Sequence, residues 1–231
     1  MRSRPDTLFA LSITLTLLAV SIRARPSTDL ALAPQDAGAM DRNGPMRIAL
    51  LVDTSDGVGS AMTQIRGAVA AFADALAPEH ELMLVTIGRH TQVRVQPTTD
   101  RKKVKDSANG LTVDRGATAL MDSMMEVDQR FLRDAGDRWS AMVVLTGNGN
   151  ENSIRTDDKG LNDWLRSVSR RRISIDAIVL QFQPNGMPEV IARAATRAAG
   201  GRIESTTRAG ALADMMKAIA ERLGTEHPPR H

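Results

Sequence analysis

Asp53 follows directly on an apolar run, residues 48–52, and Ser55 comes next but one. They are two residues apart, so on an extended turn both side chains can face the same way. Mg²⁺ prefers oxygen ligands, keeps several waters and takes one or two carboxylates together with other oxygen donors. Thr118 can add a hydroxyl group from a second loop. These residues are therefore a candidate site for a hard divalent cation.

Other chemistries that begin with a carboxylate or with glycines at a strand end are not matched. A dinucleotide site needs Gly-x-Gly-x-x-Gly, but Gly57 and Gly59 are followed by Met62. An aspartyl phosphoryl-transfer enzyme needs a second acid two residues after Asp53, where Ser55 stands. The sequence contains no Gly-Lys-Ser or Gly-Lys-Thr for a P-loop, no Gly-x-Ser-x-Gly and no cysteine nucleophile.

The composition argues against a nucleic-acid partner. Thirty Lys and Arg against 27 Asp and Glu give a net charge of +3, and aromatic residues make up only 3%. A nucleic-acid binder usually has a clustered basic face with aromatic stacking platforms. The basic cluster 170–172 lies where a helix should end, and we interpret it as complementing the helix dipole. Four histidines lack the spacing of a zinc site and are interpreted as ordinary surface residues: His80, His90, His227 and His231.

The first 22 residues have the pattern of an export signal. Arg2 and Arg4 precede an apolar run, residues 8–22, which is shorter than the roughly 20 residues of a membrane-spanning helix. We expect residues 1–22 to be a signal peptide or an N-terminal anchor, and residues 23–45 to be a flexible linker. The protein is then exported, to the periplasm or the extracellular space, and an uncleaved segment would anchor it to the membrane.

Strands and helices alternate along residues 46–224, which we expect to form one domain, followed by a disordered tail at residues 225–231. Short β-branched or apolar runs predict strands, and apolar stripes with spacings of three and four predict helices. The alternation favours an α/β fold with a mostly parallel sheet and helices on both faces. The predicted strands are 47–52, 82–87, 91–95, 141–145, 173–180 and 202–205, and the predicted helices are 60–76, 100–111, 118–132, 161–168, 189–199 and 212–223.

Ligands of such sheets collect in the crevice beyond the carboxyl ends of the strands. Three predicted loops reach that edge, at residues 53–59, 115–118 and 146–152. We therefore expect these loops to lie close together and to form the functional surface.

Each of the three loops resembles a motif of the von Willebrand factor type A family. Residues 50–60, LLVDTSDGVGS, resemble the Asp-x-Ser-x-Ser motif, and residues 116–124, GATALMDSM, are similar to Gly-Gly-Thr-x-Leu-x-Asp. Residues 141–153, AMVVLTGNGNENS, lie where the family has a strand ending in Leu-Thr-Asp-Gly. The resemblance covers residues 47–223. It implies a three-layer, Rossmann-like, doubly wound sheet of about six strands, the third antiparallel, and a metal-ion-dependent adhesion site completed by a partner's carboxylate.

Two positions depart from the metal site that the resemblance implies. Asp53, Ser55 and Thr118 match three of the five ligand positions, but Gly57 replaces the second serine and Gly147 replaces the second aspartate. Loss of outer-shell partners alone lowers metal affinity by roughly 10- to 100-fold. We therefore expect a degenerate site at which binding of Mg²⁺ or Mn²⁺ is weak or lost.

Other interpretations of the same residues stay open at this point. Asn148, Asn150 and Glu151 are candidate substitute ligands, and Asp56 could act through a water molecule. Alternatively, the residues have only local structural roles: Asp53 and Ser55 end a strand and cap the next turn, Thr118 caps a helix above Asp122, and residues 148–150 form a turn.

The expected function is that of an exported protein-binding module of the adhesion or scaffold type, and not that of an enzyme. We expect another protein to bind at the loops above the sheet, through an Asp or Glu side chain, and we expect no nucleic acid. Contact with a membrane would come only from an uncleaved N-terminal segment. The alternatives are a hydrolase or phosphoryl-transfer enzyme that uses the acidic crevice around Asp53, and a structural domain with no ligand at this edge.

Overall fold

The computed structural model describes residues 44–154, 157–171, 173–182 and 186–226. The predicted signal or anchor at 1–22, nearly all of the predicted linker and the end of the predicted tail lie outside these residues. Within them, no helix is long and apolar enough to cross a membrane.

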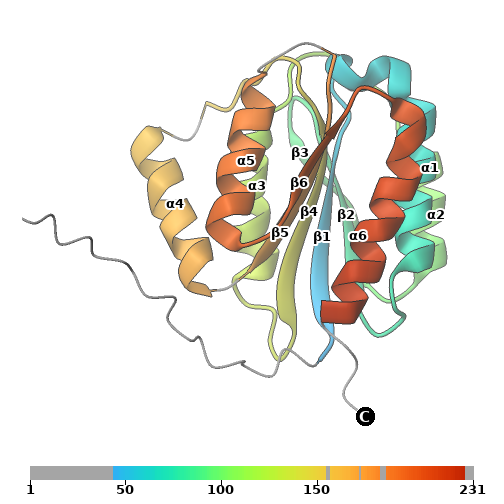
Figure 1. Cartoon of the computed structure of the whole chain (residues 1–231), viewed down its shortest axis with the longest axis vertical. Helices are drawn as coiled ribbons and strands as arrows, with labels where there is room; N and C mark the ends of the chain where they lie inside the picture. Colours follow the sequence, from blue (N-terminus) through green and yellow to red (C-terminus); the bar gives the residue numbers. More distant parts are fainter. Residues whose placement is uncertain (1–43, 155–156, 172, 183–185, 227–231) are drawn as a thin grey trace, which may run out of the picture. The chain divides into compact units, whose positions relative to one another are not determined.

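Six strands form one sheet in the order β3-β2-β1-β4-β5-β6 (Figure 1). β3 runs antiparallel to β2, and every other neighbouring pair is parallel. The α/β fold class and the antiparallel third strand are therefore confirmed. The strands are β1 (Met46–Asp53), β2 (Glu81–Ile87), β3 (Thr91–Thr98), β4 (Trp139–Gly147), β5 (Ser174–Leu180) and β6 (Ile203–Thr206).

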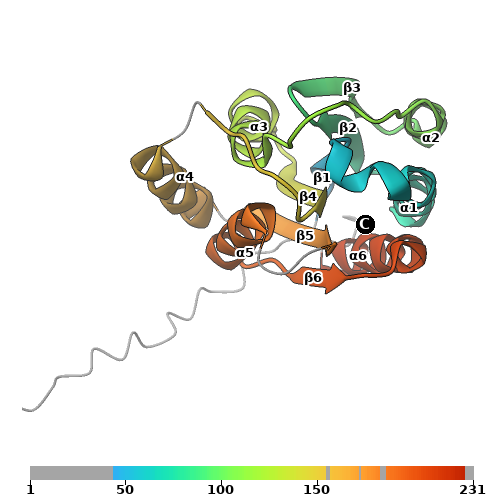
Figure 2. The ribbon, with the colours of Figure 1, turned by 90° about the horizontal axis from the view of Figure 1, so that it is seen from above.

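Helices cover both faces of the sheet, as Figure 2 shows from above. α1, α2 and α6 pack on one face, and α3, α4 and α5 pack on the other. The helices are α1 (Met62–Ala75), α2 (Arg101–Asn109), α3 (Leu120–Val127), α4 (Asp158–Arg171), α5 (Met187–Ala199) and α6 (Leu212–Glu226), with the short helical turns η1 (Asp56–Ala61), η2 (Asp128–Leu132) and η3 (Ala209–Ala211).

The central strand β1 shows why the strand sequences are apolar without interruption. Ile48 and Leu50 belong to the core on the α1 side, whereas Ala49 and Leu51 belong to the core on the α3 side. A strand that is buried on both faces needs apolar residues at every position. The sheet therefore forms a rigid base whose carboxyl edge carries the predicted loops.

The helix predicted over 118–132 is shorter than expected, and the structure gives the reason. α3 begins only at Leu120, because the backbone of Thr118 pairs with the loop after β4. At its other end α3 passes into the π-helical turn η2, where the buried carboxylate of Asp128 accepts a hydrogen bond from Trp164 Nε1 at 3.0 Å. Asp128 also pairs with Arg171 at 2.6 Å, so this member of the basic cluster links α4 to η2.

Two smaller predictions are wrong. The side chain of His80 is buried, and its Nδ1 accepts a hydrogen bond from Met46 N at 3.1 Å, so it supports the start of β1 and does not face solvent. α6 continues to Glu226, two residues into the predicted tail. His90 is exposed, as predicted, whereas His227 and His231 lie outside the described residues.

Candidate functional site

Three loops meet at the carboxyl edge of the sheet, and backbone hydrogen bonds join them. Asp56 N donates to Gly116 O at 3.0 Å, and Gly116 N donates to the Asp56 carboxylate at 2.8 Å. Thr118 N donates to Asn150 O at 3.1 Å, and Asn152 N donates to Thr118 O at 2.8 Å. The structure thus brings the three predicted loops together. We call this surface the rim, and define it as residues 54–61, 112–119 and 148–154.

Asp53 lies at the end of β1 beneath the rim and is buried. Its Oδ1 accepts a hydrogen bond from Ser55 N at 2.8 Å, and its Oδ2 accepts from Thr146 Oγ1 at 3.1 Å and from Gly147 N at 3.0 Å. Burial raises the pKa of this carboxyl, and the hydrogen bonds offset only part of that shift. Asp53 therefore holds the ends of β1 and β4 together, and a bound cation would stabilise its charged form.

The two hydroxyl groups of the predicted site are also buried. Ser55 is 3% exposed and Thr118 is 1% exposed. Thr118 Oγ1 has no hydrogen-bond partner among the described residues. A buried hydroxyl without a partner costs stability and is rare in folded proteins. It is the feature of the site that best fits a missing ligand such as a metal ion or an ordered water.

Gly147, at the position of the second aspartate, has no room for a side chain. A Cβ atom built on Gly147 would lie 2.7 Å from Val58 Cγ1 and 3.7 Å from Asp53 Oδ2. Val58 itself is buried, so its methyl group fills the space in which a side chain at residue 147 would begin. Gly57, in contrast, is not required by lack of space. A Cβ atom there would make ordinary contacts of 3.5 Å with Ser55 Oγ and Gly149 Cα.

The candidate substitute ligands are engaged elsewhere. Asn148 is buried, and its Oδ1 accepts a hydrogen bond from Phe182 N at 2.8 Å. Glu151 accepts from Leu120 N at 2.9 Å and from Met121 N at 3.5 Å, and so caps the start of α3. The prediction that Thr118 caps this helix is therefore wrong.

Other candidates around the site have clear positions. Asp122 lies in the first turn of α3, as predicted, and its carboxylate accepts a hydrogen bond from Ile154 N at 2.9 Å. The Asp56 carboxylate is bound to Gly116 N, whereas Asn150 is exposed above the site.

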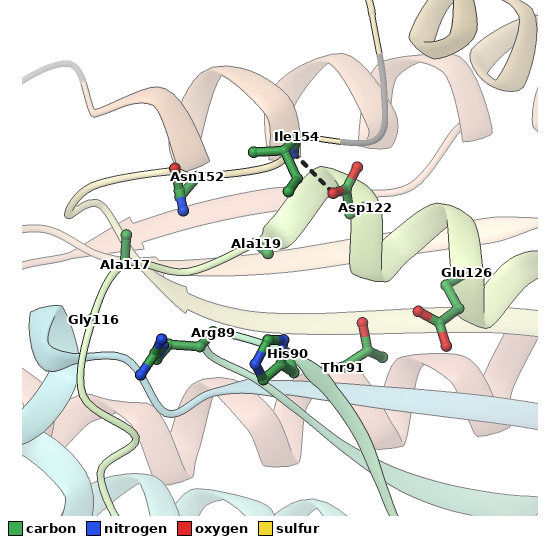
Figure 3. A pocket seen from close by; sticks show the side chains of 10 residues that line it. All are labelled: Arg89, His90, Thr91, Gly116, Ala117, Ala119, Asp122, Glu126, Asn152 and Ile154. Carbon is green, nitrogen blue, oxygen red and sulfur yellow. Dashed lines mark hydrogen bonds between the residues drawn. The ribbon is translucent and has the colours of Figure 1, made fainter.

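Two pockets open at the rim. The central pocket, of about 440 Å³, lies above the candidate metal site, and the lateral pocket, of about 560 Å³, lies between the β2–β3 turn and α3 (Figure 3). Gly116 and Ala117 line both of them. The lining of the central pocket is Ser55, Asp56, Gly57, Gly116, Ala117, Gly149, Asn150 and Phe182.

Sequence reasoning missed the apolar character of this edge. Phe182 is 50% exposed after β5, and Ile154 is 82% exposed after β4. The exposed large apolar residues of the described chain all lie on loops or first helical turns near the carboxyl ends of the strands: Val113, Ile154, Phe182, Met187 and Val190. Clustered exposed apolar side chains mark interaction surfaces more often than single ones do. A scan for apolar residues in the predicted loops could have found them.

Comparison with known proteins agrees with this fold. Residues 48–150 match the sequence model of the von Willebrand factor type A domain. A search of curated protein sequences gave no match. A von Willebrand factor type A protein from Catenulispora acidiphila aligns with a TM-score of 0.64 and 15% identity, over 77% of this chain and 42% of that one.

Two further solved structures share the fold. An aerotolerance-related membrane protein from Bacteroides fragilis aligns with a TM-score of 0.58 and 11% identity, over 77% of this chain and 99% of that one. Proximal thread matrix protein 1 from the mussel byssus, with a zinc-occupied metal-ion-dependent adhesion motif, aligns with a TM-score of 0.62 and 15% identity, over 79% and 46%. The chain thus spans less than half the length of two of these three relatives.

The chain carries a von Willebrand factor type A domain. The sequence match extends from β1 into the loop after β4, and so includes the first two segments of the rim and the start of the third.

Proposed function

We propose that this protein is an exported protein-binding module of the adhesion or scaffold type, which holds its partner at the rim and depends little on a divalent metal. The observation that carries the proposal is that two exposed apolar side chains, Phe182 and Ile154, line the two pockets at the carboxyl edge of the sheet. Domains of this family generally act in protein interactions without catalysis of their own, which supports a binding role.

The weak metal dependence follows from the ligand set. Asp53 is the one carboxylate at the site, and its two oxygens already accept three hydrogen bonds. Val58 fills the space beside Gly147, so a second carboxylate is missing. A protein of the same fold holds zinc in its adhesion motif, which supports the position of the proposed site. It says nothing about the metal affinity of this chain. We propose that Mg²⁺ or Mn²⁺ binds weakly through Asp53, Ser55 and Thr118, and that a partner's Asp or Glu strengthens this binding.

Export is proposed from the N-terminal pattern at residues 1–22. Among the proteins that share the fold are a membrane protein and a byssal matrix protein, and both descriptions are compatible with a place outside the cytoplasm. The protein would then act in the periplasm or the extracellular space, released or anchored by its N-terminal segment.

A capture experiment with matched variants tests the proposal. The full chain, tagged at its C-terminus, is incubated with an envelope extract of its own cells, once with Mg²⁺ and once with EDTA. Phe182→Glu places a charge in the central pocket, and Ala218→Glu places the same charge on the exposed face of α6. We expect Phe182→Glu to lose a partner that wild type and Ala218→Glu retain in both buffers. Equal capture by all three proteins would contradict the proposal.

A further inference from the structure

The lateral pocket carries both acidic and basic side chains. Arg89 and His90 come from the β2–β3 turn, Asp122 and Glu126 from α3, and Asn152 from the loop after β4 (Figure 3). The volume of about 560 Å³ is large enough for a side chain of a partner protein. The acidic side chains and the hydrogen-bond donors of the pocket differ in whether they already form hydrogen bonds within the domain.

The acids are engaged. The Asp122 carboxylate accepts a hydrogen bond from Ile154 N at 2.9 Å. Glu126 accepts from Arg130 Nη1 at 2.6 Å, one helical turn further along the chain. A cationic ligand in this pocket would have to compete with these bonds.

The donors are not engaged. The side chains of Arg89, His90 and Asn152 make no hydrogen bond or ion pair with another residue in the described part of the chain. Arg89 and His90 are exposed to solvent. An arginine guanidinium presents several N–H groups in a planar fork that matches a carboxylate. The open hydrogen-bonding capacity of the pocket therefore favours an anion.

Gly116 directs Arg89 toward the rim. A Cβ atom on Gly116 would lie 3.0 Å from Arg89 Cγ and 3.3 Å from Arg89 Cδ, and the glycine has a φ of +118°. The stem of Arg89 thus lies over the loop that separates the two pockets, with its guanidinium on the Gly116 side (Figure 3). A permanent positive charge therefore lies next to the Gly116 loop, which lines both pockets.

We propose that Arg89 binds a carboxylate of the partner protein in the lateral pocket without a metal ion, with His90 and Asn152 as further donors. The inference rests on the proposed function, because the carboxylate belongs to the protein docked on the rim. Ile154 borders the same pocket and is 82% exposed. A free anion would leave this side chain uncovered. The occupant is therefore a protein segment in which Asp or Glu stands next to an apolar residue.

A peptide selection tests this inference. A displayed library of random peptides is selected against the full chain in EDTA, and the affinity of the selected peptides is measured by fluorescence polarisation. We expect peptides that contain Asp or Glu beside an apolar residue. Arg89→Gln should weaken their binding roughly tenfold or more, because it removes a charge-assisted hydrogen bond. Arg94→Gln is the matched control, since it makes the same charge change on the exposed face of β3, and it should change binding less than about twofold.

Several outcomes would overturn the inference. They are selected peptides without acids, binding that Arg89→Gln leaves unchanged, binding that requires Mg²⁺, and displacement by inorganic phosphate at the affinity of the peptide, which would indicate a site for free anions. Peptides that lose affinity for Phe182→Glu but not for Arg89→Gln would overturn this inference alone and leave the central pocket as the binding surface. Peptides that bind both variants like wild type would count against the proposed function as well.

Discussion

Val58 Cγ1 lies 2.7 Å from the point at which a side chain on Gly147 would begin. A distance below about 3 Å cannot be kept by a real Cβ atom, so the valine and a second acid exclude each other. The replacement of the aspartate by glycine is therefore matched by apolar packing within the site. At the position where the family resemblance predicts a second carboxylate, the structure therefore has the methyl group of Val58.

This relationship predicts how metal binding can be restored. Gly147→Asp alone should lower the free energy of unfolding by about 1–3 kcal/mol, because it overpacks the site against Val58. The triple variant Gly57→Ser, Val58→Ala and Gly147→Asp removes the contact with Val58 Cγ1, and the other contacts of the two added Cβ atoms are 3.5 Å or longer. Its stability should rise by about 2.7 kcal/mol when Mg²⁺ reaches about 100 times its dissociation constant. Chemical denaturation with Mg²⁺ or EDTA measures both effects, and a triple variant that ignores Mg²⁺ would contradict the account.

Asp53 should be essential for stability whether or not a metal binds. Asp53→Ala removes the acceptor of Ser55 N, Thr146 Oγ1 and Gly147 N. Buried donors without an acceptor cost about 1–3 kcal/mol, and we expect a loss of that size in urea denaturation. Asp74→Ala is the control, because the exposed pair of Asp74 with Lys105 contributes less than about 1 kcal/mol. Equal stability of the two variants would show that Asp53 is not bonded as described.

The same substitution should have a pH-dependent effect. Burial raises the pKa of Asp53 above its ordinary value of 3.8, so the folded state binds the proton more tightly than the unfolded state does. The contribution of Asp53 to stability is then complete below the unfolded pKa and declines as the pH rises through the folded pKa. We expect Asp53→Ala to cost more at about pH 4 than at about pH 7 in metal-free buffer. The opposite order would mean that the folded carboxyl has a lowered pKa.

Thr118→Val distinguishes a role of this hydroxyl in metal binding from a role in the stability of the fold. The valine keeps the shape of the side chain and removes a buried hydroxyl that has no partner among the described residues. In EDTA the variant should be as stable as wild type or more stable by about 1 kcal/mol. Any Mg²⁺ or Mn²⁺ dependence of the wild-type melting temperature should disappear. Thr112→Val, an exposed position in the same connection, serves as control. A metal response that survives Thr118→Val would remove this residue from the site.

The sequence predicted the fold because burial of β1, β4 and β5 on both faces leaves long apolar runs. It also predicted that the three loops converge, since parallel strands place their carboxyl ends at one edge. It did not predict that Glu151 caps α3, because that contact joins Leu120 to a residue 31 positions away. The roles of Val58 and His80 likewise depend on packing between distant segments, which neither spacing nor composition records.

Amide hydrogen exchange of the full chain, alone and with the partner captured by wild type, tests the central claim most directly. The rim is the proposed docking surface, so binding should slow exchange at residues 54–61, 112–119 and 148–154. The exposed faces of α4 and β3 should be unaffected. Protection confined to those faces, with no change at the rim, would contradict the account.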